Sequence, residues 1–113
     1  MTRSRKPTYT KKDIARKLSA LSGENRRASS AWVDRIFTVL RETMMSANPE
    51  LRIEIRDFGV FEVKVTKSKP KARNPKSGEI IFVPSRRKTH FKPSKLLRGF
   101  LSKPLPGAPG RQA

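Results

Sequence analysis

The sequence lacks cysteine and holds a single histidine, and both shortages restrict its chemistry. Without cysteine there is neither a disulfide framework nor a thiolate metal site. No group of histidine and acidic residues has metal-ligand spacing, and no glycine-rich phosphate loop is present. Catalysis therefore lacks candidate groups. We expect no enzyme activity, no catalytic residues, no metal or other cofactor, and no small-molecule substrate.

Acidic residues are also scarce, with 9 Asp and Glu against 27 Lys and Arg, for a formal net charge of +18. The positive charges repel one another and oppose compact folding of the chain, and a polyanionic partner relieves this repulsion. Nucleic acid is the leading candidate. A membrane is the weaker one, because no long apolar run or amphipathic basic anchor stands out. The basic residues 1–7 are not followed by an apolar segment, which argues against a secretory signal and favours a cytoplasmic location.

The helical part of the chain is expected before residue 50. Thr10 and Asp13 are spaced as a helix N-cap pair, and Gly23 ends that helix. A second helix is expected to end at the Asn48-Pro49 pair, and its apolar pattern is helical from Ala31. Its start is open, because four residues could cap it: Ser22, Asn25, Ser29 and Ser30. Its apolar stripe, which includes Trp32, is wide enough to contact both its own domain and a partner chain. A second copy is a natural way to complete so small a body.

Strands are expected over residues 51–55, 58–65 and 79–83, followed by a short helix that starts at residues 91–93. This order predicts an α+β fold: a helical base, a three-stranded antiparallel sheet and an extended β-ribbon arm at about residues 66–79. One domain over residues 10–103 would then lie between a basic flexible tail, residues 1–9, and a Pro/Gly-rich flexible tail, residues 104–113. The alternation of apolar and polar residues along these strands places Phe58, Phe61 and Phe82 in the core. It places Glu54 and Glu62 on the surface.

The arm is the feature around which the chain is organised, because a long polar segment between two strands must project into solvent. Alternation along a strand predicts that Lys67, Lys69, Lys71 and Arg73 share one face, with a spacing comparable to that of DNA phosphates. The only acid after Glu62 is Glu79, which argues against an ordinary solvated hairpin. The expected DNA-binding residues are Lys67, Lys69, Lys71, Arg73, Asn74, Pro75, Lys76, Gly78, Arg86, Arg87, Lys88, Lys92 and Lys95.

The residues of the tip suit a minor groove. Arg73 can enter a narrow groove, where the potential is most negative. Asn74 can form a hydrogen bond at the groove floor, and Pro75 offers a rigid apolar edge without an N–H group. Gly78 lets the chain turn back. Lys92 and Lys95, together with Arg98, could clamp phosphates on the body, although ordinary surface charge explains them equally well.

Three blocks resemble the bacterial histone-like DNA-binding proteins, HU and integration host factor. They are Phe58-Gly59-x-Phe61, Arg73-Asn74-Pro75-x-x-Gly78-Glu79 and Phe91-Lys92-Pro93-x-Lys95, and the match runs from about Thr10 to Leu101. The resemblance implies an intertwined dimer whose two β-arms hold duplex DNA through the minor groove. It also implies that Pro75 is the wedge, since HU and integration host factor are themselves among the minor-groove proteins that insert apolar side chains between base steps.

Two departures from the family pattern concern the body. Asp57 stands where glycine is common, and the junction from Gly23 to Ser30 is expected to be several residues longer than usual. The function that follows is bending or compaction of nucleoid DNA, largely without sequence specificity, by a homodimer. A heterodimer, a sequence-preferring subunit like those of integration host factor, and an RNA-binding basic protein remain as alternatives.

Overall fold

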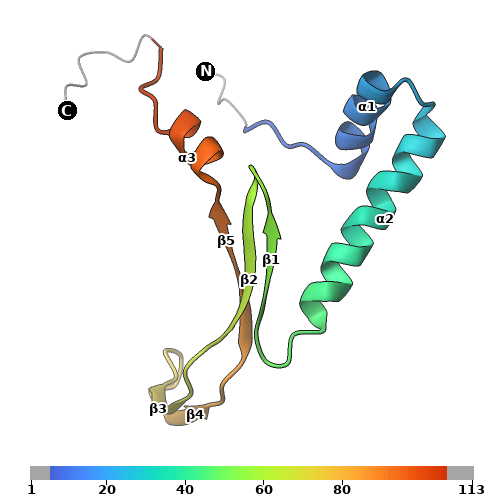
Figure 1. Cartoon of the computed structure of the whole chain (residues 1–113). Helices are drawn as coiled ribbons and strands as arrows, with labels where there is room; N and C mark the ends of the chain where they lie inside the picture. Colours follow the sequence, from blue (N-terminus) through green and yellow to red (C-terminus); the bar gives the residue numbers. More distant parts are fainter. Residues whose placement is uncertain (1–5, 107–113) are drawn as a thin grey trace. The chain divides into compact units, whose positions relative to one another are not determined.

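The computed structural model describes residues 6–106 of the chain (Figure 1). Most of the two expected tails, residues 1–5 and 107–113, lies outside the described residues. The chain divides into two compact units, residues 1–45 and 46–113. The described part of the first unit is helical, and that of the second combines antiparallel strands with one short helix, so the α+β fold is confirmed.

The first unit is a pair of helices, α1 (Lys11–Ser22) and α2 (Arg26–Met45). The cap of α1 is the expected one, since the Asp13 carboxylate accepts a hydrogen bond from the Thr10 backbone N–H at 2.8 Å. Gly23 ends α1 in the left-handed region, at φ 81°. Among the described residues of this unit, Ala15 and Val33 are the buried apolar side chains.

The structure decides which of the possible caps begins α2. The helix begins at Arg26, five residues before the clear apolar pattern, because the Asn25 side-chain oxygen accepts the Ala28 N–H at 2.8 Å and so caps the first turn. The junction between the helices is therefore only residues 23–25. The expectation of a long junction through Ser30 is wrong, because several residues there can cap a helix and the sequence does not rank them.

The second unit contains the strands β1 (Leu51–Ile55), β2 (Gly59–Val65), β3 (Lys69–Arg73), β4 (Ile80–Val83) and β5 (Arg87–Pro93), followed by helix α3 (Lys95–Leu101). Within the described residues, β1, β2 and β5 form a three-stranded antiparallel sheet in the order β1-β2-β5, and β3 and β4 form a separate two-stranded ribbon. The third strand of the sheet is thus β5, and residues 80–83 belong to the arm instead.

The residues around Phe91 also differ from expectation, because residues 91–93 are the end of β5 and not the start of a helix. Helix α3 begins after Ser94, whose hydroxyl accepts the Leu97 N–H at 3.1 Å. Phe91 pairs with Phe61 across the sheet, with ring centroids 4.8 Å apart, and its ring lies 5.4 Å from that of Phe58. This aromatic cluster joins β2 to β5, although Phe58 itself is 47% exposed and not in the core as expected.

Candidate functional site

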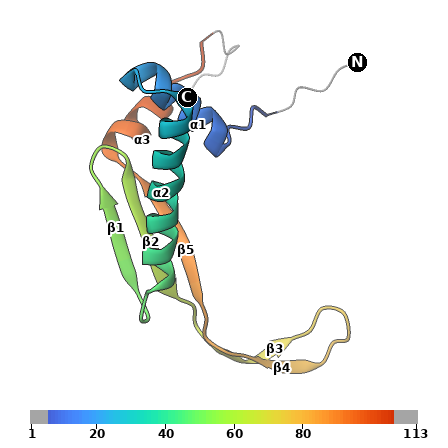
Figure 2. The ribbon, with the colours of Figure 1, turned by 90° about the vertical axis from the view of Figure 1, so that its right-hand side faces the viewer.

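The ribbon of β3 and β4 continues beyond β2 and β5 and leaves the three-stranded sheet (Figure 2). At its base the Thr66 N–H donates to the Arg86 carbonyl at 2.7 Å, and the Arg86 N–H donates to the Thr66 hydroxyl at 2.9 Å. These two bonds hold the limbs of the arm together where it leaves the sheet.

The tip of the arm is a turn ordered by its own hydrogen bonds. The Asn74 side-chain oxygen accepts the Lys76 N–H at 2.9 Å, and the Asn74 carbonyl accepts the Gly78 N–H at 2.7 Å. Gly78 has φ 76°, a conformation that glycine adopts without steric cost. The Arg73 guanidinium donates to the Gly78 carbonyl at 3.2 Å. Pro75 is exposed on this ordered turn.

The register of the ribbon overturns the expected row of four cations on one face. Lys69 lies opposite Val83 and Ala72 opposite Ile81, so two residues of β3 stand against one of β4 and the ribbon contains a bulge. Pro70 falls in the bulge, where its missing N–H is tolerated. Because strictly opposed residues share a face, Lys69 and Arg73 lie on opposite faces of the arm.

The expected site residues are accessible to a ligand. Asn74 is half-buried, and the others are exposed: Lys67, Lys69, Lys71, Arg73, Pro75, Lys76, Gly78, Arg86, Arg87, Lys88, Lys92 and Lys95. Arg87 also has a structural role, since its guanidinium donates to the carbonyl of buried Ala47 at 2.6 Å. A guanidinium has five N–H donors, so this bond leaves others available.

A charged cluster on the sheet was not anticipated, because Glu62 was expected to be exposed and is buried. Its carboxylate lies 3.5 Å from the ammonium groups of Lys64 and Lys92, and 3.7 Å from the Arg52 guanidinium. Burial by itself raises the pKa of Glu62, but the charges of Lys64 and Lys92 outweigh it and hold that pKa below its usual value. Glu62 therefore stays ionised and keeps three cations together.

Near the start of α3, Lys92 and Arg98 line one open hollow, together with Asp57 of the turn between β1 and β2. Lys95 is not among the residues that line it. Two of the three suspected clamp residues thus line one hollow, which is also lined by a second acidic residue, Glu54, and by Arg56. Asp57 has φ 64°, in the region where glycine is favoured.

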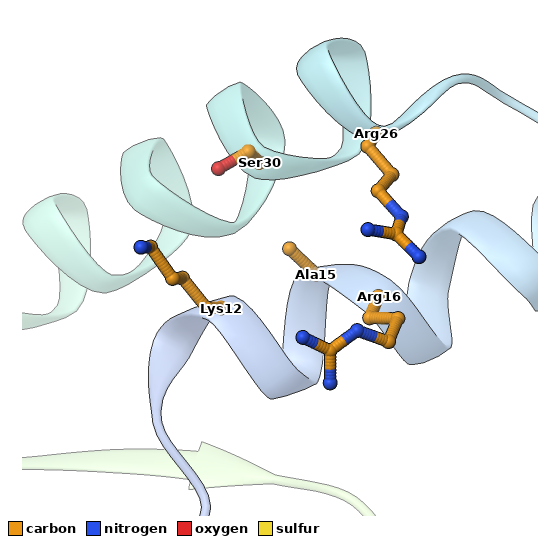
Figure 3. Close-up of a pocket in the computed structure, with 5 residues that line it drawn as sticks. All are labelled: Lys12, Ala15, Arg16, Arg26 and Ser30. Carbon is orange, nitrogen blue, oxygen red and sulfur yellow. The ribbon is translucent and has the colours of Figure 1, made fainter.

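The helical unit carries a further group of cations that the sequence analysis did not single out. Lys12 and Arg16 of α1 and Arg26 of α2 line a hollow between the two helices (Figure 3). Arg16 is paired with Asp13 at 3.0 Å. The helical spacing of Lys12 and Arg16 is visible in the sequence, but their approach to Arg26 depends on how the helices pair.

The exposed cations of the ribbon can bind a polyanion along its length. Within residues 6–106, no group of three or more His, Cys, Asp or Glu side chains has a geometry that could hold a metal ion. No helix in the same part of the chain is long and apolar enough to cross a membrane.

Comparison with known proteins agrees with a surface that binds a polyanion. The family described as bacterial DNA-binding protein matches residues 9–101. The integration host factor subunit alpha of Ralstonia nicotianae is 32% identical over 105 residues, which cover 90% of this chain and 97% of that protein. The subunit alpha of Hydrogenovibrio crunogenus is 36% identical over 89 residues, covering 79% and 88% of the two chains.

The fold has a counterpart among solved structures. A chain of an Anabaena HU–DNA cocrystal structure superposes with a TM-score of 0.71, covering 85% of this chain and all of that one, at 22% sequence identity. At that identity the likeness establishes the fold alone.

Proposed function

Because the chain belongs to the family of bacterial DNA-binding proteins, we propose that it bends or compacts duplex DNA, which its arm contacts through the minor groove. The observation that carries this proposal is the exposed ribbon, whose segment from residue 66 to residue 86 contains six Lys and Arg residues and a single acid, Glu79. Such a protein acts on the nucleoid, in the cytoplasm, and has no catalytic role.

Most of the affinity comes from the release of counterions as cations of the arm and body neutralise phosphates. The arm contributes cations on both faces, because the bulge separates Lys69 from Arg73. In the body, Lys92 is shared between Glu62 and any phosphate it meets. The arm cations therefore contribute more to the salt dependence of binding than Lys92 does.

Pro75 is the wedge that unstacks a base step. It is exposed, and the hydrogen bonds of Asn74 order the turn around it before DNA binds. A wedge on an ordered turn loses little conformational freedom on insertion. Unstacking costs on the order of a few kcal/mol, and the bend offsets this cost by bringing more phosphates to the body.

A second copy of the chain completes the body. Among the described residues only Ala15, Val33, Ala47 and Val63 are buried apolar side chains. Large apolar side chains such as Trp32, Phe100 and Leu101 remain half or more exposed, which is more than a stable monomer exposes as a rule. The assembly is a dimer with two arms.

A heterodimer with a related subunit is the alternative that one observation favours, because both relatives named above are described as subunits. Minor-groove contacts distinguish mainly A·T from G·C pairs, so any sequence preference of such a pair would come largely from DNA deformability.

The test is energy transfer between dyes at the two ends of a random-sequence duplex, titrated with the protein. We expect transfer to rise on binding, and Pro75→Ala to reduce that rise more than it reduces affinity. Pro84→Ala is the matched control, because Pro84 is also exposed but lies after β4, away from the tip. A Pro75→Ala protein that bends DNA as well as the wild type would refute the wedge. Stronger binding to RNA than to DNA would favour the RNA-binding alternative.

A further inference from the structure

Phe82 was expected in the core, and the structure places it in solvent on the arm. The side chains of Phe82 and Ile80 are 63% and 62% exposed, although both belong to strand β4. Their neighbour Ile81 is 42% exposed and Val83 is half-buried. The most exposed apolar residues of the ribbon are therefore alternate residues of one strand.

The register assigns these two residues to one face. Ile80 lies opposite Arg73, and Phe82, two residues along, lies opposite the bulge of Pro70 and Lys71. Ile81 pairs with Ala72 on the other face. One face of the arm thus carries Ile80, Phe82 and Arg73, and we call it the Phe82 face.

A two-stranded ribbon has no second layer that could cover this face. Apolar side chains exposed in this way on an extended arm mark a surface that another molecule covers. A second arm is a poor occupant, because each arm carries six cations and one acid, and two such arms repel each other. The minor groove of DNA is complementary to this face in charge and in polarity. Phosphates line its edges and attract the cations, and the deoxyribose C–H groups of its walls are apolar.

We infer that the Phe82 face is the side of the arm that enters the minor groove, with Phe82 packed against sugars behind the Pro75 wedge. Residues i and i+2 of a strand are separated by roughly 6.8 Å, about two base-pair rises. Phe82 therefore contacts the groove about two base pairs farther from the tip than Ile80. This inference rests on the proposed function, since it specifies which residues contact the DNA that the arm holds.

The first experiment compares Phe82→Thr with Ile81→Thr as a matched control on the opposite face. Threonine is β-branched and favours strands, as phenylalanine and isoleucine do, so both variants keep a high strand propensity. We expect Phe82→Thr to weaken binding to a random-sequence duplex about tenfold at every salt concentration, because apolar contact is lost while phosphate contacts remain. The slope of affinity against salt should not change, and Ile81→Thr should bind within about threefold of the wild type.

A second experiment does not depend on a loss of binding. Trp32 is the only tryptophan, so Phe82→Trp in a Trp32→Phe background carries one reporter on the arm. We expect its emission to shift to the blue and to become protected from acrylamide when duplex DNA is added. A tryptophan at position 81 in the same background should remain accessible to acrylamide.

Several outcomes would overturn the inference and leave the proposed function intact. One is a protein that binds and bends DNA normally after Phe82→Thr, and another is equal loss at positions 82 and 81. A third is Phe82-dependent binding to phosphatidylglycerol vesicles without any effect on DNA. Dissociation of the free dimer by Phe82→Thr would assign the face to a second copy. A wild-type protein that does not bind duplex DNA would refute both proposals.

Discussion

Replacing Gly59 with alanine tests how closely β2 and β5 approach each other at this position. A Cβ at this position would lie 2.4 Å from the Lys92 carbonyl oxygen and within 2.9 Å of two atoms of the Phe91 ring. The oxygen belongs to the backbone of β5, which pairs with β2 at this point, so it cannot rotate away as a side chain can. Gly59 also has φ 158°, which other residues rarely adopt.

Two costs combine in the Gly59→Ala variant. Overpacking of this kind costs about 1–3 kcal/mol, and a backbone conformation unfavourable to alanine adds a comparable amount. We therefore expect a loss of about 3 kcal/mol in the free energy of unfolding. For a chain of this size the midpoint of thermal unfolding should fall by roughly 10 °C.

The assay is thermal unfolding followed by circular dichroism, with Gly78→Ala as the control. Gly78 also has a positive φ, at 76°, but a Cβ there meets nothing within 4 Å, so only the backbone cost of about 1–2 kcal/mol applies. Equal losses at the two glycines would show that the contact with Lys92 has no energetic weight. A Gly59→Ala protein as stable as the wild type would refute the reasoning altogether.

Two further predictions concern the charged groups of the sheet unit. Asp57→Gly should raise stability by up to about 1 kcal/mol, because Asp57 has φ 64°. The same change should tighten DNA binding at low salt, since it removes a carboxylate from the hollow of Lys92 and Arg98, and an isotherm with unchanged affinity would count against phosphate binding there. The lowered pKa of Glu62 stabilises the fold above the usual value of 4.5, and this contribution is lost as the pH falls through the lower folded-state pKa. Glu62→Gln should therefore be less stable than the wild type at neutral pH and approach it in acid, and a stability difference that does not change with pH would contradict the role of the ion pairs.

The sequence predicted helix α1 and strand β1 well, because their signals lie in neighbouring residues. The cap of α1 needs only Thr10, Asp13 and Gly23, and alternation over residues 51–55 is enough to indicate β1. The sequence left the start of α2 open, because serine and asparagine can both cap a helix and only the folded chain shows that Asn25 does.

Strand β5 was missed because its sequence has no strand pattern of its own. Residues 87–92 are exposed and mostly polar, so apolar alternation is absent. The segment is extended because its backbone pairs with β2, from Arg87 opposite Val65 to Pro93 opposite Gly59. That pairing is non-local, and no local propensity predicts it.

The charge of this protein and the turn that presents Pro75 follow from the sequence alone, because they depend on composition and on neighbouring residues. The sequence also indicates where the arm begins, but the extent of its second limb depends on the pairing of β3 with β4. Tertiary structure decided which residues share a face. The bulge at Pro70 and Lys71 separates Lys69 from Arg73, and the missing second layer leaves Phe82 in solvent. The burial of Glu62 likewise depends on strands from distant parts of the chain. Register and burial are properties of paired strands, which a single strand does not specify.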